Sequence, residues 1–108
     1  MRRPMSVLLN LAMFPLDKGE SLSAHVAKIV AMIDESGLDY RLTPMGTIIE
    51  TDDLETALKV VSEAYGRIGA DCARVYAALT LDIRKSRGGR LQQKVESVEG
   101  KLGKKVKT

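Results

Sequence analysis

The stretch PMGTIIETDD, residues 44–53, decides how the chain is expected to fold. Pro44 disfavours a helix just before it, and Gly46 permits backbone conformations that other residues avoid. The run TIIET that follows is rich in β-branched residues and is typical of a strand. Asp52 or Asp53 can then cap a helix. This one segment therefore predicts a turn, a strand and the start of a helix in succession.

Elements on both sides of this segment follow from hydrophobic spacing, which alternates in strands and recurs every three or four residues in helices. Ser21 can cap the first helix, and Gly37 can end it. In chain order, the expected elements are a strand at 6–14, a helix at 21–36, strands at 39–43 and 47–51, a helix at 54–68, a strand at 72–84, and a helix with apolar residues from 91 to 102.

The order of these elements predicts the α+β class. The first six match the ferredoxin-like βαββαβ arrangement, to which a C-terminal helix is added. Right-handed crossovers place both main helices on one face of a four-stranded antiparallel sheet. We treat residues 5–103 as a single domain and expect residues 1–4 and 104–108 to be flexible tails.

The sheet face that these two helices leave open is predicted to be apolar. Strand alternation places on it Leu8, Ala12, Phe14, Tyr76 and Ala78. A face of this kind is too apolar for open water. We therefore expect a homodimer or homotetramer in which sheet faces pack together and form pockets at the seam.

Composition narrows the possible chemistry. The 108 residues include one cysteine, Cys72, and one histidine, His25. A single cysteine excludes an intrachain disulfide and a cysteine-cluster metal site. No P-loop, GxGxxG or HExxH motif is present. No apolar run approaches the ~20 residues of a membrane span. We expect a cytoplasmic protein that is not an enzyme, holds no metal or cofactor, and has no membrane partner.

A basic tail leaves an alternative function open. The net charge is +3, and much of the excess lies in the last quarter of the chain. We interpret this tail as a solvated helix face and a frayed terminus. The alternatives are a nucleic-acid-binding module or a small regulatory or interaction domain. RNA-recognition modules stack bases on sheet aromatics, of which this chain has few, so nucleic acid is the disfavoured partner.

Glu50 is the most unusual candidate for a site, because it lies in a strand between Ile49 and Thr51. A carboxylate at a dry seam needs a cation or strong donors. Arg41 or Arg84 could pair with it across neighbouring strands, or a ligand could supply the donors or the positive charge. An enzyme with Glu50 as general base would need a second group, and the sequence offers none.

Other groups are expected to complete a ligand site beside Glu50. Asn10 contributes an amide, and Thr47 contributes a hydroxyl that is expected on the same face. Gly46 would let a ligand approach the backbone closely, and Met45 would supply polarizable packing. This set suits small-molecule binding better than catalysis.

The segment YRLTPMGTIIE, residues 40–50, and the closing DIR at 82–84 resemble the small thiamine-binding proteins of the YkoF-like superfamily, and the similarity spans about residues 5–103. The resemblance implies a ferredoxin-like fold and a tetramer built as a pair of dimers. It also implies a carrier or sensor that binds thiamine or a related pyrimidine without turnover. Thr47 and Glu50 carry over as ligand-binding residues within the signature, and Asn10 and Arg84 carry over from outside it.

Overall fold

The computed structural model describes residues 5–19, 22–86 and 88–108 of the chain. Its elements are β1 (Ser6–Pro15), α1 (Ser23–Ser36), β2 (Asp39–Thr43), β3 (Gly46–Thr51), α2 (Leu54–Ile68), the 3-10 turn η1 (Gly69–Asp71), β4 (Val75–Arg84) and α3 (Arg90–Leu102). The predicted order of strands and helices is confirmed.

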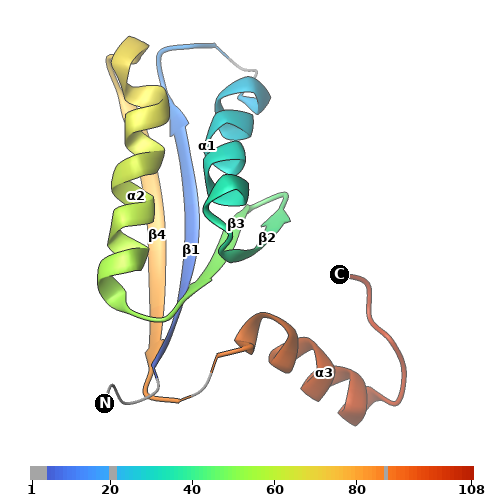
Figure 1. Ribbon diagram of the computed structural model, residues 1–108. Coiled ribbons are helices and arrows are strands. Elements are labelled where there is room, and N and C mark those ends of the chain that lie inside the picture. The colour runs from blue at the N-terminus through green and yellow to red at the C-terminus, as the bar shows by residue number, and fades with distance from the viewer. Residues whose placement is uncertain (1–4, 20–21, 87) are drawn as a thin grey trace.

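The strands form one antiparallel sheet in the order β2-β3-β1-β4. This is the order of the ferredoxin-like arrangement, in which the first strand lies at the centre because each crossover returns on the same side of the sheet. Figure 1 shows α1 and α2 side by side over one face of the sheet. The predicted α+β fold is confirmed.

The starts of the two main helices differ in how they are capped. Asp53 caps α2, because its carboxylate accepts a hydrogen bond from the Thr56 amide at 2.7 Å. Ser21, the expected cap of the first helix, lies outside the described residues. The N-cap position of α1 is Leu22, which offers no side-chain hydrogen bond. Gly37 ends α1 in a left-handed conformation, as expected.

β4 begins at Val75, three residues later than predicted, because the chain first forms η1 and then bends. The carboxylate of Asp17 holds this bend by accepting a hydrogen bond from the Ala73 amide at 2.7 Å. That hydrogen bond lowers the pKa of the Asp17 carboxyl. Cys72 therefore lies just outside the strand, at the end of η1.

The core lies between the sheet and the two helices. The odd-numbered side chains of β1 point toward the helices and are buried, as is Ile49 on β3. The helices contribute apolar side chains from one stripe each. The buried core residues are Val7, Leu9, Leu11, Met13, Ile29, Met32, Ile33, Ile49, Ala57, Val60, Ala64 and Ile68.

The opposite face of the sheet carries the even-numbered side chains of β1. Phe14 pairs with Tyr76 and Ala12 pairs with Ala78 across the β1–β4 ladder. The two aromatic rings lie with their centroids 5.3 Å apart. The predicted placement of these residues on the open face is confirmed.

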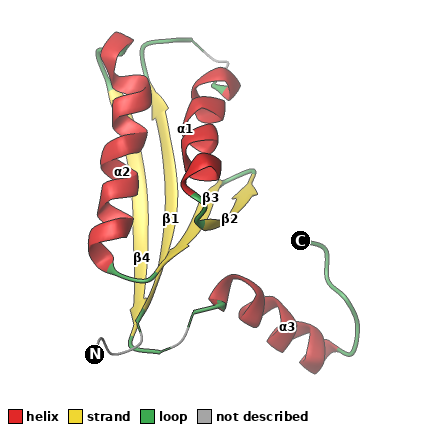
Figure 2. Ribbon diagram, in the orientation of Figure 1, coloured by secondary structure: helices red, strands yellow, loops and turns green. Residues whose placement is uncertain are grey.

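α3 reaches this open face only at its first turn and then leads away from the two-layer body (Figure 2). Leu91 and Val95 are half-buried, whereas Val98 and Leu102 are exposed. The apolar stripe of α3 is therefore covered only at the end nearest the sheet. Beyond the helix, the Val106 amide donates to the Glu99 carboxylate at 2.8 Å.

We predict that Leu9→Ala lowers the free energy of unfolding by about 2–5 kcal/mol, because it leaves a cavity in the middle of the core. Leu9 is fully buried, whereas Leu58 on α2 is exposed. Leu58→Ala is therefore the matched control and should change stability by less than about 0.5 kcal/mol. Urea denaturation monitored by circular dichroism measures both. Equal losses in the two variants would contradict this assignment of the core.

Candidate functional site

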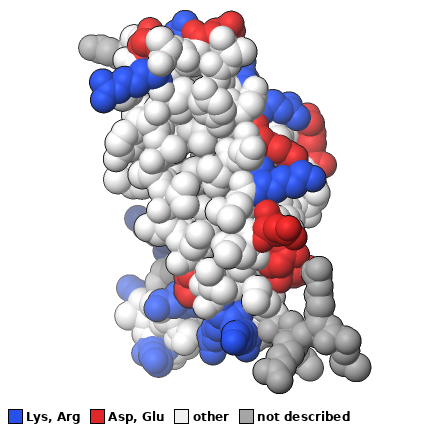
Figure 3. Space-filling view, turned by 90° about the vertical axis from the view of Figure 1, so that its left-hand side faces the viewer, with Lys and Arg blue, Asp and Glu red and all other residues white. Residues whose placement is uncertain are grey.

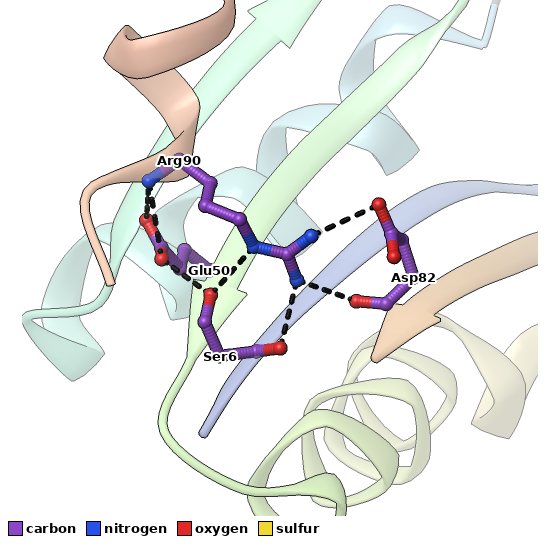
Figure 4. A network of polar contacts seen from close by, with 4 residues as sticks. All are labelled: Ser6, Glu50, Asp82 and Arg90. Carbon is purple, nitrogen blue, oxygen red and sulfur yellow. Dashed lines mark hydrogen bonds and ion pairs between the residues drawn. The ribbon is translucent and has the colours of Figure 1, made fainter. Parts of the chain in front are cut away.

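Glu50 is buried, with only 7% of the residue exposed, and its carboxylate meets the start of α3. One oxygen accepts hydrogen bonds from the Gly89 amide at 3.1 Å and the Arg90 amide at 3.0 Å. The other oxygen accepts a hydrogen bond from the Ser6 hydroxyl at 2.6 Å (Figure 4). An anion is favourable at a helix N-terminus, where amides lack intrahelical partners. Glu50 therefore caps α3 and fixes it to the sheet.

Arg90 completes this network from the first residue of α3, and only 6% of it is exposed. Its guanidinium donates to the Ser6 hydroxyl at 3.0 Å and to the carbonyl oxygens of Ser6 and Asp82 at 2.7 Å. It also forms an ion pair with the Asp82 carboxylate at 2.9 Å (Figure 4). The network joins β1, β3, β4 and α3, and the Ser6 hydroxyl links the Glu50 carboxylate to the Arg90 guanidinium.

This arrangement corrects the expectation for Glu50. Neither arginine that was expected to pair with it does so: Arg41 donates to Gln92 at 3.0 Å, and Arg84 is an exposed residue opposite Ser6. Both Glu50 oxygens already accept hydrogen bonds from the chain itself. Within the chain, the carboxylate thus anchors α3. Sequence reasoning did not identify Arg90 as part of this network.

A pocket of about 890 Å³ lies on the other side of the sheet, between α1 and the turn that joins β2 to β3. Its walls are largely apolar and come from α1, the C-terminal half of β1 and the β2–β3 turn. Its volume is within the range of small-molecule sites. Among the expected site residues, Met45, Gly46 and Thr47 line it.

The remaining expected site residues, Asn10, Glu50 and Arg84, lie on the open face of the sheet. Thr47 pairs with Leu11 on the helix-facing side, whereas Glu50 pairs with Leu8 on the open side. Residues three apart in a strand point to opposite faces, because side chains alternate. The expectation that Thr47 and Glu50 share one face is therefore wrong.

Gly46 is needed at the turn because β1 packs against it. Its φ is +156°, and a Cβ there would lie 3.0 Å from both the Asn10 Oδ1 atom and the Leu11 carbonyl oxygen. A side chain at this position would push the turn away from β1. The close approach expected at Gly46 is thus made by the neighbouring strand, and the glycine shapes the end of the pocket.

Asp34 and Tyr40 form a hydrogen-bonded polar pair in the lining of the pocket. The Tyr40 hydroxyl donates to the Asp34 carboxylate at 2.8 Å, and this hydrogen bond raises the pKa of Tyr40. The phenol therefore remains a donor at neutral pH. Sequence reasoning missed Asp34, although it follows Val30 at a spacing of four on the helix face that lines the pocket.

The charge of the pocket is negative. Asp34 is acidic, and none of the described residues that line the pocket is lysine, arginine or histidine. Such a site favours a cationic or neutral ligand over an anion.

Within the described ranges, no group of three or more potential metal-ligating side chains occurs. The helices in those ranges are also too short or too polar to cross a bilayer.

Comparison with known proteins places the chain in a family. A sequence model of the family described as Thiamine-binding protein matches residues 9–99. A UPF0045 protein of Methanothermobacter thermautotrophicus is 35% identical over 100 residues, which cover 89% of this chain and 99% of the relative. The UPF0045 protein MJ1052 of Methanocaldococcus jannaschii is 30% identical over 92 residues, which cover 85% of this chain and 91% of the relative.

Solved structures share the fold. The crystal structure of MJ1052 superimposes with a TM-score of 0.77 and covers 86% of this chain and 95% of its own. A Thermotoga maritima protein provisionally assigned to thiamine biosynthesis or salvage superimposes with a TM-score of 0.73. It is 18% identical and covers 86% of this chain and 98% of its own, so it supports the fold alone.

We predict that Glu50→Ala releases α3 from the sheet and lowers the free energy of unfolding by about 1–3 kcal/mol, because buried amide and hydroxyl donors lose their acceptor. Hydrogen exchange of the α3 amides should become faster. Glu96→Ala is the matched control, because Glu96 is exposed on the same helix. Unchanged exchange in the Glu50 variant would contradict the anchoring role.

Proposed function

Because the chain belongs to the family described as Thiamine-binding protein, we propose that it binds thiamine or a closely related aminopyrimidine between α1 and the β2–β3 turn. The observation that carries this proposal is the charge of the pocket. Its walls are apolar, it holds the acidic Asp34, and none of its described lining residues is basic. Thiamine combines an uncharged aromatic ring with a permanent positive charge, so it suits both features.

Each part of thiamine has a counterpart in the pocket. The thiazolium ring carries the positive charge and would lie near the carboxylate of Asp34, an exposed residue whose attraction for a cation is modest because water screens it. The aminopyrimidine would pack against the apolar wall, where Met45 adds a polarizable and exposed side chain. Thr47, which also lines the pocket, is a buried residue.

The negative charge of the pocket also bears on whether phosphorylated forms of thiamine can bind. Thiamine diphosphate adds negative charges, and no cationic side chain lies among the described lining residues to receive them. Repulsion by Asp34 would add to that cost. We therefore propose that the unphosphorylated vitamin, and not its diphosphate, is the preferred ligand.

We further propose that binding occurs without turnover. The titratable side chains of the described pocket lining are Asp34 and Tyr40, and they are hydrogen-bonded to each other. A nucleophile activated by a neighbouring base, or two acids with different pKa values, would be needed for the usual hydrolytic reactions. A carrier or sensor role fits this lining better.

We predict that isothermal titration calorimetry detects thiamine binding to the wild-type protein and about tenfold weaker binding of thiamine diphosphate. Asp34→Asn should weaken thiamine binding about fivefold, because it removes the charge but keeps an acceptor for Tyr40.

Glu35→Gln is the matched control for this experiment. Glu35 is the next residue, is exposed and is not part of the pocket lining, although it lies 3.6 Å from Arg67. Its variant should bind thiamine as the wild type does. Absence of heat with thiamine would refute the proposed ligand, and equal loss in both variants would refute the role of Asp34.

Self-association is a second part of the proposal. The open face of the sheet presents the Phe14–Tyr76 pair together with Leu8, Ala12 and Ala78. Seen from the side formed by β4 and α2, a wide area without charged residues continues along the molecule (Figure 3). Exposed apolar patches mark interaction sites. We propose that a second copy of the chain covers the open face, because a two-fold axis makes one apolar patch complementary to itself.

Tyr76→Glu is therefore expected to shift the protein toward the monomer in sedimentation velocity experiments, since it buries an unpaired charge at the proposed seam. Leu58→Glu is the control, because Leu58 on α2 is 48% exposed and Tyr76 is 50% exposed. It should leave the assembly intact. A wild-type protein that sediments as a monomer at every concentration would contradict the proposal.

A further inference from the structure

The central strand β1 has unequal neighbours. It pairs with β4 along its whole length, from Ser6 to Pro15, but its pairing with β3 ends at Leu11 and Thr47. The chain turns back at the β2–β3 turn before β3 can accompany the rest of β1. The C-terminal part of β1 is therefore an open sheet edge on that side, and this edge lines the pocket.

The direction of the backbone groups along this edge follows from the ladder. The Leu16 amide donates to the Arg74 carbonyl oxygen at 2.8 Å, which continues the unbroken β1–β4 register. In an antiparallel ladder the residues of a strand face its two neighbours alternately. Even-numbered residues of β1 thus face β4, and odd-numbered residues face the other way. The Leu11 carbonyl, which lies next to Gly46, agrees with this assignment.

Met13 is the residue that this pattern exposes to the pocket. Its N–H and C=O point away from β4, two residues beyond the last pair with β3. Pro15 occupies the next position on that side and has no N–H to offer. Proline is tolerated in a strand where the N–H side lacks a partner strand, so its presence is an independent sign of a free edge. The Met13 N–H and C=O and the Pro15 C=O remain, and a single donor is too little for an added peptide strand.

We infer that the backbone N–H and C=O of Met13 recognise the aminopyrimidine edge of the ligand as a donor–acceptor pair, an inference that rests on the proposed function. The amino group of an aminopyrimidine donates, and the adjacent ring nitrogen accepts. The backbone of one extended residue presents the complementary pair on one side of the strand. Unpaired backbone groups in an apolar pocket are costly, and a ligand of this type would relieve that cost.

The Asp34 carboxylate gives the ligand a direction in this arrangement. Asp34 lies on α1, whereas Met13 lies on β1, and both residues line the pocket. A cationic ring held near Asp34 would direct the other ring of the ligand toward the strand edge. A ligand whose pyrimidine has the donor and acceptor exchanged should therefore bind more weakly, because turning it around would move its cationic ring away from Asp34.

Two measurements on the wild-type protein test the inference. Amide hydrogen exchange followed by nuclear magnetic resonance should show that saturating thiamine slows exchange at Met13 at least tenfold. The Leu11 amide is the internal control and should change little, because the register already pairs Leu11 with Thr47. Oxythiamine, which has a carbonyl in place of the amino group and a protonated neighbouring nitrogen, should bind at least tenfold more weakly than thiamine in calorimetry.

The outcomes separate this inference from the function on which it rests. Thiamine binding with unchanged exchange at Met13, or with equal affinity for oxythiamine, would overturn the recognition by the strand edge and leave the proposed function intact. Absence of thiamine binding would overturn both. Slower exchange at Met13 together with weaker binding of oxythiamine would support the inference.

Discussion

The unequal pairing of β1 is the constraint on which the rest of the structure depends. Its register with β4 contains ten residue pairs, whereas its register with β3 contains five. The difference arises because the β2–β3 hairpin turns at Pro44 and Met45, halfway along the central strand. A longer hairpin would extend the sheet and fill the space beside α1. The short hairpin instead leaves a pocket with an open strand edge as one of its walls.

The two faces of the sheet have separate roles. On the helix side lies the pocket, with Thr47 at the start of β3. On the open side, Glu50 near the other end of the same strand receives the first turn of α3. A buried carboxylate is costly unless strong donors surround it, and here the Ser6 hydroxyl and the amides of Gly89 and Arg90 supply them. The same short strand thus shapes a cavity and anchors a helix.

Much of the fold could be predicted from the sequence, because it depends on patterns that are local in the chain. The alternation of side chains in residues 6–14 and 72–84 predicted which residues lie on each face of the sheet. The acidic pair before Leu54 predicted the helix cap, which is Asp53 in the structure. The family resemblance of residues 40–50 is confirmed by the match over residues 9–99. The expected site residues do not form one cluster, since Met45, Gly46 and Thr47 line the pocket, whereas Asn10, Glu50 and Arg84 lie on the open face of the sheet.

By itself the sequence determined the order of the elements, the apolar character of each face and the family, since all three follow from residue types at fixed spacing. Only the tertiary structure decided that Glu50 meets the start of α3, because Arg90 and Ser6 are far from it in the chain. The tertiary structure also decided that Asp34 faces the pocket and that Met13 lies on a free edge. These relationships depend on where one strand ends beside another, and no periodicity within a single segment records that.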